Sequence, residues 1–194
     1  MLQRPEVLRH IDAAFPDQPV VITLGGTVRE MLAVVGRKAN HLYSLDAMGQ
    51  TLPIGLGLAL GIADNARHEK LIVIEGDGSL LMGFSALTTV GHLKPRKLVL
   101  IVLDNGAYLA TGGQPTAARD TDFSSVARAC GWADARDVES SAEALKQTLE
   151  WAQRSQGPIL LRVPVGAEQP KIDFFLEDPV VLGRDFQDWL RKRD

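Results

Sequence analysis

The chain has 194 residues, of which 45% are hydrophobic and 23% charged, and its net charge is −3. This composition is that of an ordinary globular protein, and the length favours one domain, spanning residues 1–194. The weak negative charge argues against nucleic acid or an anionic membrane as a partner, and no run approaches the ~20 apolar residues of a membrane span.

The amino-terminal residues and the cysteine content predict the compartment. Residues 1–6 lack the apolar core of a signal peptide, which favours a cytoplasmic location. Cys130 is the single cysteine, so an internal disulfide is excluded, as is typical of a reducing compartment. It ends an apolar helical pattern before Gly131, and we interpret it as a packing residue rather than a nucleophile.

Strands and helices are predicted to alternate along the whole chain. Helices are expected near 5–15, 29–32, 52–61, 80–93, 123–130, 141–154 and 184–193, and strands near 20–24, 42–45, 71–74, 98–103, 132–138 and 159–163. This order predicts an α/β fold with a single doubly wound, mostly parallel sheet and helices on both faces. From about residue 166 the chain becomes polar and rich in proline, which predicts a C-terminal extension.

The predicted helix at 52–61 is unusually rich in small residues, with Gly55, Gly57, Ala59 and Gly61. Each glycine weakens a helix by about 1 kcal/mol. Close packing against another backbone would compensate for that loss, so we expect such packing here.

Two polar segments follow neighbouring apolar strands. Residues 75–79 (Glu-Gly-Asp-Gly-Ser) come after the strand at 71–74, and residues 104–108 (Asp-Asn-Gly-Ala-Tyr) come after the strand at 98–103. Ligands bind outside the carboxyl ends of parallel strands. Carboxylate, amide and carbonyl oxygens suit Mg²⁺, while glycines and a helix start suit a phosphate. The two segments therefore predict a metal-bridged diphosphate.

The pair of segments resembles the signature of thiamine diphosphate enzymes, Gly-Asp-Gly followed by a distant Asn. Here 26 residues separate Gly78 from Asn105. The resemblance covers about residues 20–116. Within the superfamily it is closest to the 2-oxo acid decarboxylases acting on sulfopyruvate and phosphonopyruvate, through residues 27–31, 47–49, 53–60, 104–108 and 111–116.

The resemblance implies a role for each matching residue. Asp77, Asn105 and the carbonyl of Ala107 would bind Mg²⁺. The diphosphate and its surroundings would be contacted by Gly25, Thr27, Gly76, Gly78, Ser79 and Tyr108. Met48 would be the apolar wedge that bends the cofactor, or else a core residue, and the Asp46 carbonyl would accept a hydrogen bond from the aminopyrimidine.

Some positions leave the roles open. Asp104 stands where the family has Asn, either orienting the metal site or only starting the turn, and Ala107 replaces a Gly that contributes only backbone. His41 precedes the Met48 loop and either approaches the site or lies at a strand end. The loop with Thr111 and Gln114 either contacts substrate or is structural.

The family's activating glutamate has no counterpart here. The glutamates of the first half are Glu6, Glu30, Glu69 and Glu75, and none matches its context. The resemblance therefore implies the β subunit of a hetero-oligomer, with a partner α subunit that carries the glutamate. The implied activity is non-oxidative decarboxylation of a small 2-oxo acid, sulfopyruvate before phosphonopyruvate. An acetolactate synthase-like carboligase, an oxidoreductase subunit (disfavoured by the single cysteine) and a non-catalytic scaffold remain alternatives.

Overall fold

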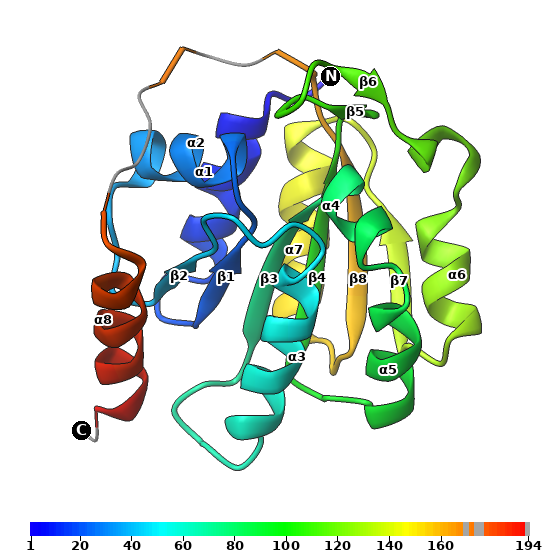
Figure 1. Ribbon diagram of the computed structural model, residues 1–194. Helices are drawn as coiled ribbons and strands as arrows, with labels where there is room; N and C mark the ends of the chain where they lie inside the picture. The colour runs from blue at the N-terminus through cyan, green and yellow to red at the C-terminus, as the bar shows by residue number, and fades with distance from the viewer. Residues whose placement is uncertain (169–170, 173–176, 193–194) are drawn as a thin grey trace.

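A computed structural model describes residues 1–168, 171–172 and 177–192. Six parallel strands form the main sheet in the order β2-β1-β3-β4-β8-β7 (Figure 1). The strands of this sheet are β1 (Val20–Ile22), β2 (His41–Tyr43), β3 (Leu71–Gly76), β4 (Leu98–Asp104), β7 (Asp134–Asp137) and β8 (Ile159–Pro164). A parallel sheet surrounded by helices confirms the predicted fold class.

Helices cover both faces of the sheet. One face carries α1 (Arg4–Ala14), α2 (Gly26–Val35) and α7 (Ala142–Arg154), and the other carries α3 (Thr51–Gly61), α4 (Asp77–Met82), α5 (Ala86–Leu93) and α6 (Phe123–Ala129) (Figure 1). A 3-10 turn, η1 (Ala117–Asp120), precedes α6, and α8 (Pro179–Arg191) packs beside β2 at the sheet edge. No helix in the described part of the chain is both long enough and apolar enough to cross a membrane.

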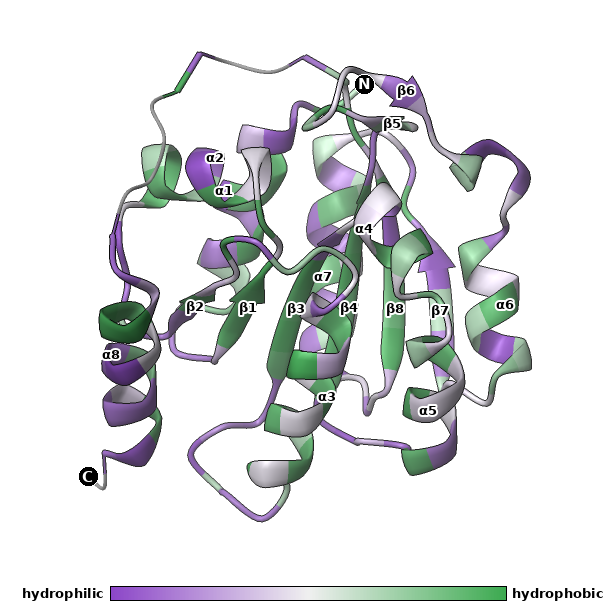
Figure 2. Cartoon of the chain, viewed as in Figure 1, coloured by the Kyte–Doolittle hydropathy of each residue, from purple (hydrophilic) through white to green (hydrophobic). Residues whose placement is uncertain are grey.

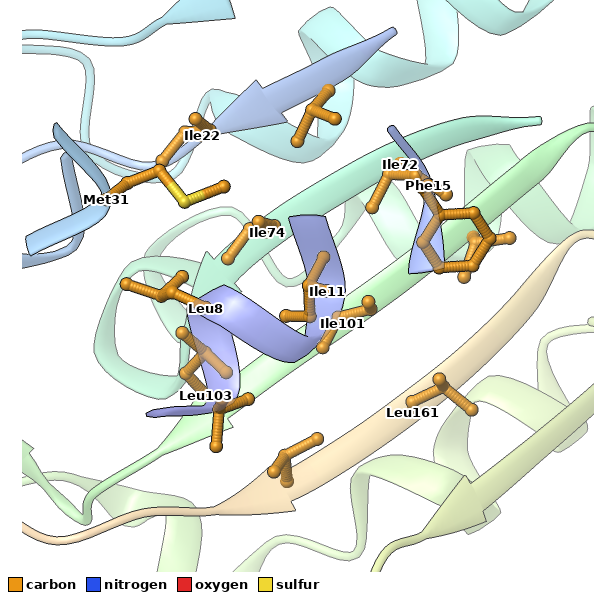
Figure 3. Packing of buried hydrophobic residues seen from close by; sticks show 14 of the residues in the cluster. Leu8, Ile11, Phe15, Ile22, Met31, Ile72, Ile74, Ile101, Leu103 and Leu161 are labelled. Atoms are coloured by element: carbon orange, nitrogen blue, oxygen red, sulfur yellow. The ribbon is translucent and has the colours of Figure 1, made fainter. Parts of the chain in front are cut away.

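Successive side chains of the central strands enter two different cores. Ile72 and Ile74 of β3 face the α1 side, whereas Leu71 and Val73 face the α3 side, as the two-residue repeat of a strand requires. Because both faces are covered, β3 and β4 are apolar until they reach Glu75 and Asp104 at their carboxyl ends (Figure 2). Figure 3 shows the α1 side, where Leu8, Ile11 and Phe15 lie over the strands.

The helix predicted at 80–93 is wrong in its bounds. The structure has two helices there, and the first begins at Asp77, three residues earlier than expected. It ends at Met82, and the next residue, Gly83, lies against the backbone of Gly49: a Cβ added to Gly83 would be 2.1 Å from the Gly49 carbonyl oxygen. The contact requires glycine at this position, and glycine is a poor helix former, so the predicted helix is interrupted here.

Two further segments differ from the sequence prediction. Part of the expected loop after Asn105 forms a small antiparallel hairpin, β5 (Ala107–Tyr108) with β6 (Gln114–Pro115). The last helix begins at Pro179 rather than 184 and buries Leu182 and Phe186, so it is amphipathic rather than polar. Residue 193, the predicted end of this helix, lies outside the described residues.

The glycine-rich helix α3 packs closely on one side only, and there against a side chain rather than the backbone that the sequence led us to expect. A Cβ at Gly55 would lie 2.2 Å from Cγ2 of Val73, so this glycine allows α3 to approach β3 closely. Gly57 and Gly61, in contrast, have no atom within 4 Å of an added Cβ. The second side of α3 is therefore open.

Candidate functional site

A pocket opens where the order of the sheet reverses. The chain passes from β1 outward to β2 and then crosses to β3, on the other side of β1. In an open parallel sheet, the crevice at the carboxyl ends of the strands on either side of such a reversal is where ligands bind. The pocket lies at that edge, and residues that follow β1, β3 and β4 line it.

The structure brings together most of the residues predicted from the sequence. Those that line the pocket are Gly25, Thr27, Met48, Gly76, Asp77, Gly78, Ser79, Asn105, Ala107 and Tyr108. Asp46 does not line it and is exposed to solvent. Thr111 and Gln114 are also exposed, with Thr111 Oγ1 3.1 Å from Gln114 Oε1, and they do not line the pocket.

Asp77 and Asn105 meet at the tips of β3 and β4. The Asn105 N–H lies 3.4 Å from Asp77 Oδ1, and the Thr116 hydroxyl donates to Asp77 Oδ2 at 2.5 Å. Asn105 Oδ1 in turn accepts from the Ala107 N–H at 2.9 Å, which fixes the turn that carries the Ala107 carbonyl. The three oxygen donors expected from the sequence therefore come from one small region.

The electrostatics of Asp77 favour a cation. Burial raises the pKa of its carboxyl, the hydrogen bond from Thr116 acts against this, and the nearby Asp104 raises it further. A positive ion beside a buried carboxylate favours its charged form. Within the described residues no three His, Cys, Asp or Glu side chains gather at a metal-binding distance. One carboxylate with neutral oxygens fits Mg²⁺, which takes few protein ligands and completes its octahedron with water and phosphate.

Both carboxylate oxygens of Asp104 have partners within the protein. Its Oδ1 accepts from the Gly106 N–H at 3.0 Å, and its Oδ2 accepts from Arg162 Nε at 2.7 Å. Asp104 is 7% exposed, so the ion pair with Arg162 compensates a nearly buried charge. It stabilises the turn that presents Asn105.

The loop that carries Met48 is fixed against α4. The Gly49 N–H donates to Ser79 Oγ at 2.9 Å, and Gly49 has φ of +78°, a conformation that favours glycine. Gly83 lies directly against the Gly49 backbone. These contacts hold Met48, which is half-buried, at the wall of the pocket.

Tyr108 covers the first turn of α4. A Cβ at Gly78 would lie 2.5 Å from Cε1 of Tyr108, so the ring rests on a position that only glycine leaves open. The Thr116 N–H closes the hairpin by donating to the Gly106 carbonyl at 2.9 Å, and the Thr116 hydroxyl attaches it to Asp77 of α4. The second half of the diphosphate signature is thereby packed onto the first.

His41 and Glu75, which are both titratable, lie outside the pocket. His41 is buried, with Nε2 3.5 Å from Asp12 Oδ1, and burial lowers its pKa to about 4 despite that carboxylate. It is a strand residue rather than a site residue. Glu75 is completely buried, and burial raises the pKa of its carboxyl.

Among the residues of the site that sequence reasoning missed are Thr116 and Arg4. Thr116 was assigned only to a loop, yet it donates to Asp77, 39 positions away. Arg4 lines the pocket although it precedes the first strand. Neither has a local signal, because both positions depend on contacts between distant segments.

Comparison with known proteins agrees with this geometry. The chain is 34% identical over 181 residues to the "Sulfopyruvate decarboxylase subunit beta" of Methanothermobacter thermautotrophicus, covering 92% of this chain and 91% of that one. It is 36% identical over 176 residues to the "Phosphonopyruvate decarboxylase" of Streptomyces viridochromogenes, covering 87% of this chain but only 43% of that one.

A solved structure has the same fold. Benzoylformate decarboxylase from Polynucleobacter necessarius superimposes with a TM-score of 0.71 at 20% identity, covering 86% of this chain and 33% of that one. The family model described as "Thiamine pyrophosphate enzyme, C-terminal TPP binding domain" matches residues 27–163, which include both strand tips and the Met48 loop. The chain therefore belongs to the family of C-terminal TPP-binding domains of thiamine pyrophosphate enzymes.

Proposed function

We propose that the chain is the β subunit of a thiamine diphosphate- and Mg²⁺-dependent decarboxylase that converts sulfopyruvate to sulfoacetaldehyde and CO₂. The observation that carries the proposal is the meeting of Asp77 and Asn105 at the tips of β3 and β4, in the pocket beside the reversal of the sheet. The similarity to a protein named as a sulfopyruvate decarboxylase β subunit supports the substrate. In this proposal residues 1–194 form one cofactor-binding domain, and its single cysteine fits a reducing cytoplasm.

The residues present fit the cofactor. Asp77, Asn105 and the Ala107 carbonyl would hold Mg²⁺, because they are oxygen donors on adjacent strand tips. The diphosphate would be contacted by Gly25, Thr27, Gly76, Gly78 and Ser79, with Tyr108 at its side. When bound, thiamine diphosphate supplies the electron sink for breaking the bond between the keto carbon and the carboxylate.

The remaining contributions of this chain are positioning and exclusion of water. Met48 would support the bent form of the cofactor, since Gly49 and Gly83 hold its loop in place. The Asp46 carbonyl would accept a hydrogen bond from the aminopyrimidine. Leu24 and Leu109 add apolar wall to the pocket and reduce its access to water.

A partner subunit is part of the proposal. No glutamate of the described residues lines the pocket, so the activating carboxyl would come from a pyrimidine-binding α subunit. The open side of α3 supports an interface: Ile54 and Leu60 are 36% and 44% exposed, and Met82 nearby is 61% exposed. Gly57 and Gly61 on this side would let a partner backbone come close.

Phosphonopyruvate is the second candidate substrate. The chain is 36% identical to a phosphonopyruvate decarboxylase, although it spans less than half of that protein. Both compounds are 2-oxo acids with a second acidic group. The same set of pocket residues could therefore bind either compound.

Reconstitution tests the proposal. The chain is mixed with a pyrimidine-domain partner, thiamine diphosphate and Mg²⁺, and CO₂ release is measured with sulfopyruvate, phosphonopyruvate and pyruvate. We expect turnover of sulfopyruvate only when both subunits are present, and none with Asp77→Asn, which removes the metal-binding carboxylate. Absence of CO₂ from all three substrates would refute the decarboxylase. Metal-dependent cofactor binding without turnover would indicate a scaffold.

A further inference from the structure

A buried ion pair adjoins the pocket. Arg4, the first residue of α1, donates from Nε to Glu30 Oε2 at 2.7 Å and from Nη2 to Oε1 of the same carboxylate. Their side chains are 7% and 2% exposed. Removing two charges from water costs several kcal/mol per ion, and buried pairs often add nothing to stability. Stability alone therefore explains this pair poorly.

The amino-terminal segment of the chain is held so that Arg4 lies at the carboxyl ends of the strands. Leu2 forms a parallel bridge with Val165, just beyond β8, and the Gly166 N–H donates to the Leu2 carbonyl at 2.9 Å. The Leu2 N–H also donates to Ser140 Oγ at 3.1 Å. The amino terminus consequently lies at the same end of the molecule as the β5–β6 hairpin, and Arg4 lines the pocket (Figure 1).

The guanidinium of Arg4 retains donors for a ligand. Glu30 occupies Nε and one Nη2 hydrogen, whereas Nη1 has no hydrogen-bond partner among the described residues and is not sealed from solvent. An arginine has five N–H donors in a fixed plane, so three remain. Glu30 does not line the pocket, which means that the pair presents its positive end to it.

The charge of the pocket points to the ligand group. Of the described residues that line it, Arg4 is the only basic one, and Asp77 is the only acidic one. We propose that Arg4, held in place by Glu30, binds an oxygen of the cofactor diphosphate through Nη1. This assignment rests on the proposed function, since it takes thiamine diphosphate as the ligand. Glu30 is a positioning residue that orients the guanidinium.

Titration calorimetry with inorganic diphosphate and Mg²⁺ tests the assignment without turnover or a partner. We expect Arg4→Gln to weaken diphosphate binding about ten- to a hundredfold, the usual range for a hydrogen bond to a charged group. The matched control is Lys38→Gln. Lys38 bonds Asp12 of α1 at 2.6 and 2.8 Å and so also ties α1 to the region of α2, but it lies outside the pocket. Its loss should leave diphosphate affinity unchanged.

A double variant guards against misfolding. R4M/E30M replaces the buried pair with apolar side chains, a change that folded proteins often tolerate, and it should lose diphosphate affinity as R4Q does. If R4Q and R4M/E30M bind diphosphate with wild-type affinity, the assignment is overturned. It is also overturned if the wild-type chain does not bind diphosphate in the presence of Mg²⁺. A parallel titration with sulfoacetate tests the other oxyanion source: weakened sulfoacetate binding with intact diphosphate binding would assign Arg4 to the substrate and overturn the proposal.

The outcomes also separate this inference from the proposed function. Arg4-dependent binding of diphosphate without CO₂ release in the reconstituted complex would sustain the inference and refute the decarboxylase. CO₂ release by a complex whose diphosphate affinity does not depend on Arg4 would support the decarboxylase and refute the inference about Arg4.

Discussion

Substitution of Gly83 by alanine places a methyl group against the Gly49 backbone. The added Cβ would lie 2.1 Å from the Gly49 carbonyl oxygen and 2.9 Å from its carbonyl carbon, whereas real Cβ contacts under 3.0 Å essentially never occur. The backbone of Gly83 itself tolerates alanine, because its φ of −110° is ordinary. Any cost therefore comes from the contact and not from the conformation.

The size of the effect follows from the geometry. The two segments must separate by about 0.9 Å before the contact becomes acceptable. Overpacking of this kind costs about 1–3 kcal/mol. For a chain of this length each kcal/mol changes Tm by about 2–4 °C, so we expect Gly83→Ala to lower Tm by about 2–12 °C. The Met48 loop should move with Gly49, and cofactor affinity should fall too.

The matched control is Gly57→Ala in the open side of α3. Nothing lies within 4 Å of a Cβ at this position, and alanine is a better helix former than glycine by about 0.5–1 kcal/mol. We expect the isolated chain to gain about 1–4 °C in Tm. Thermal denaturation of both variants measures the difference. A Gly83→Ala chain as stable as the wild type, or a Gly57→Ala chain equally destabilised, would refute the reasoning.

Three more substitutions test single contacts by urea or thermal denaturation. Because burial lowers the pKa of His41 to about 4, the unfolded chain takes up a proton between pH 6.5 and 4 that the folded chain does not. As the pH is lowered from 6.5 to 4, the free energy of unfolding should therefore decrease by up to about 3 kcal/mol. In His41→Gln this decrease should be smaller, because the titrating group is absent. Gly78→Ala should cost about 1–2 kcal/mol by displacing the Tyr108 ring, with recovery in a Tyr108→Ala background. Arg162→Met should cost about 1–3 kcal/mol by leaving Asp104 unpaired, and adding Asp104→Asn should restore most of the loss.

Much of the site was predictable because its signals are local. A strand followed by glycine and a carboxylate indicates, within a few residues, both a turn and a side chain that can bind a metal ion. The tips of β3 and β4 illustrate this, since Asp77 and Asn105 meet as their positions after two apolar runs predict. Asp46 shows the limit: no local pattern points to its carbonyl, so its role rests on the family resemblance alone and stays a prediction.

The sequence by itself determined the α/β class, the parallel sheet and the residues at the strand tips, because apolar runs and glycine turns act through neighbouring residues. Tertiary structure alone decided that Gly83, after α4, packs against Gly49, and which partner neutralises Asp104. It also decided that Arg4 and Thr116 belong to the site. These contacts join segments far apart in the chain, and packing and hydrogen bonding between such segments leave no periodicity in a single sequence.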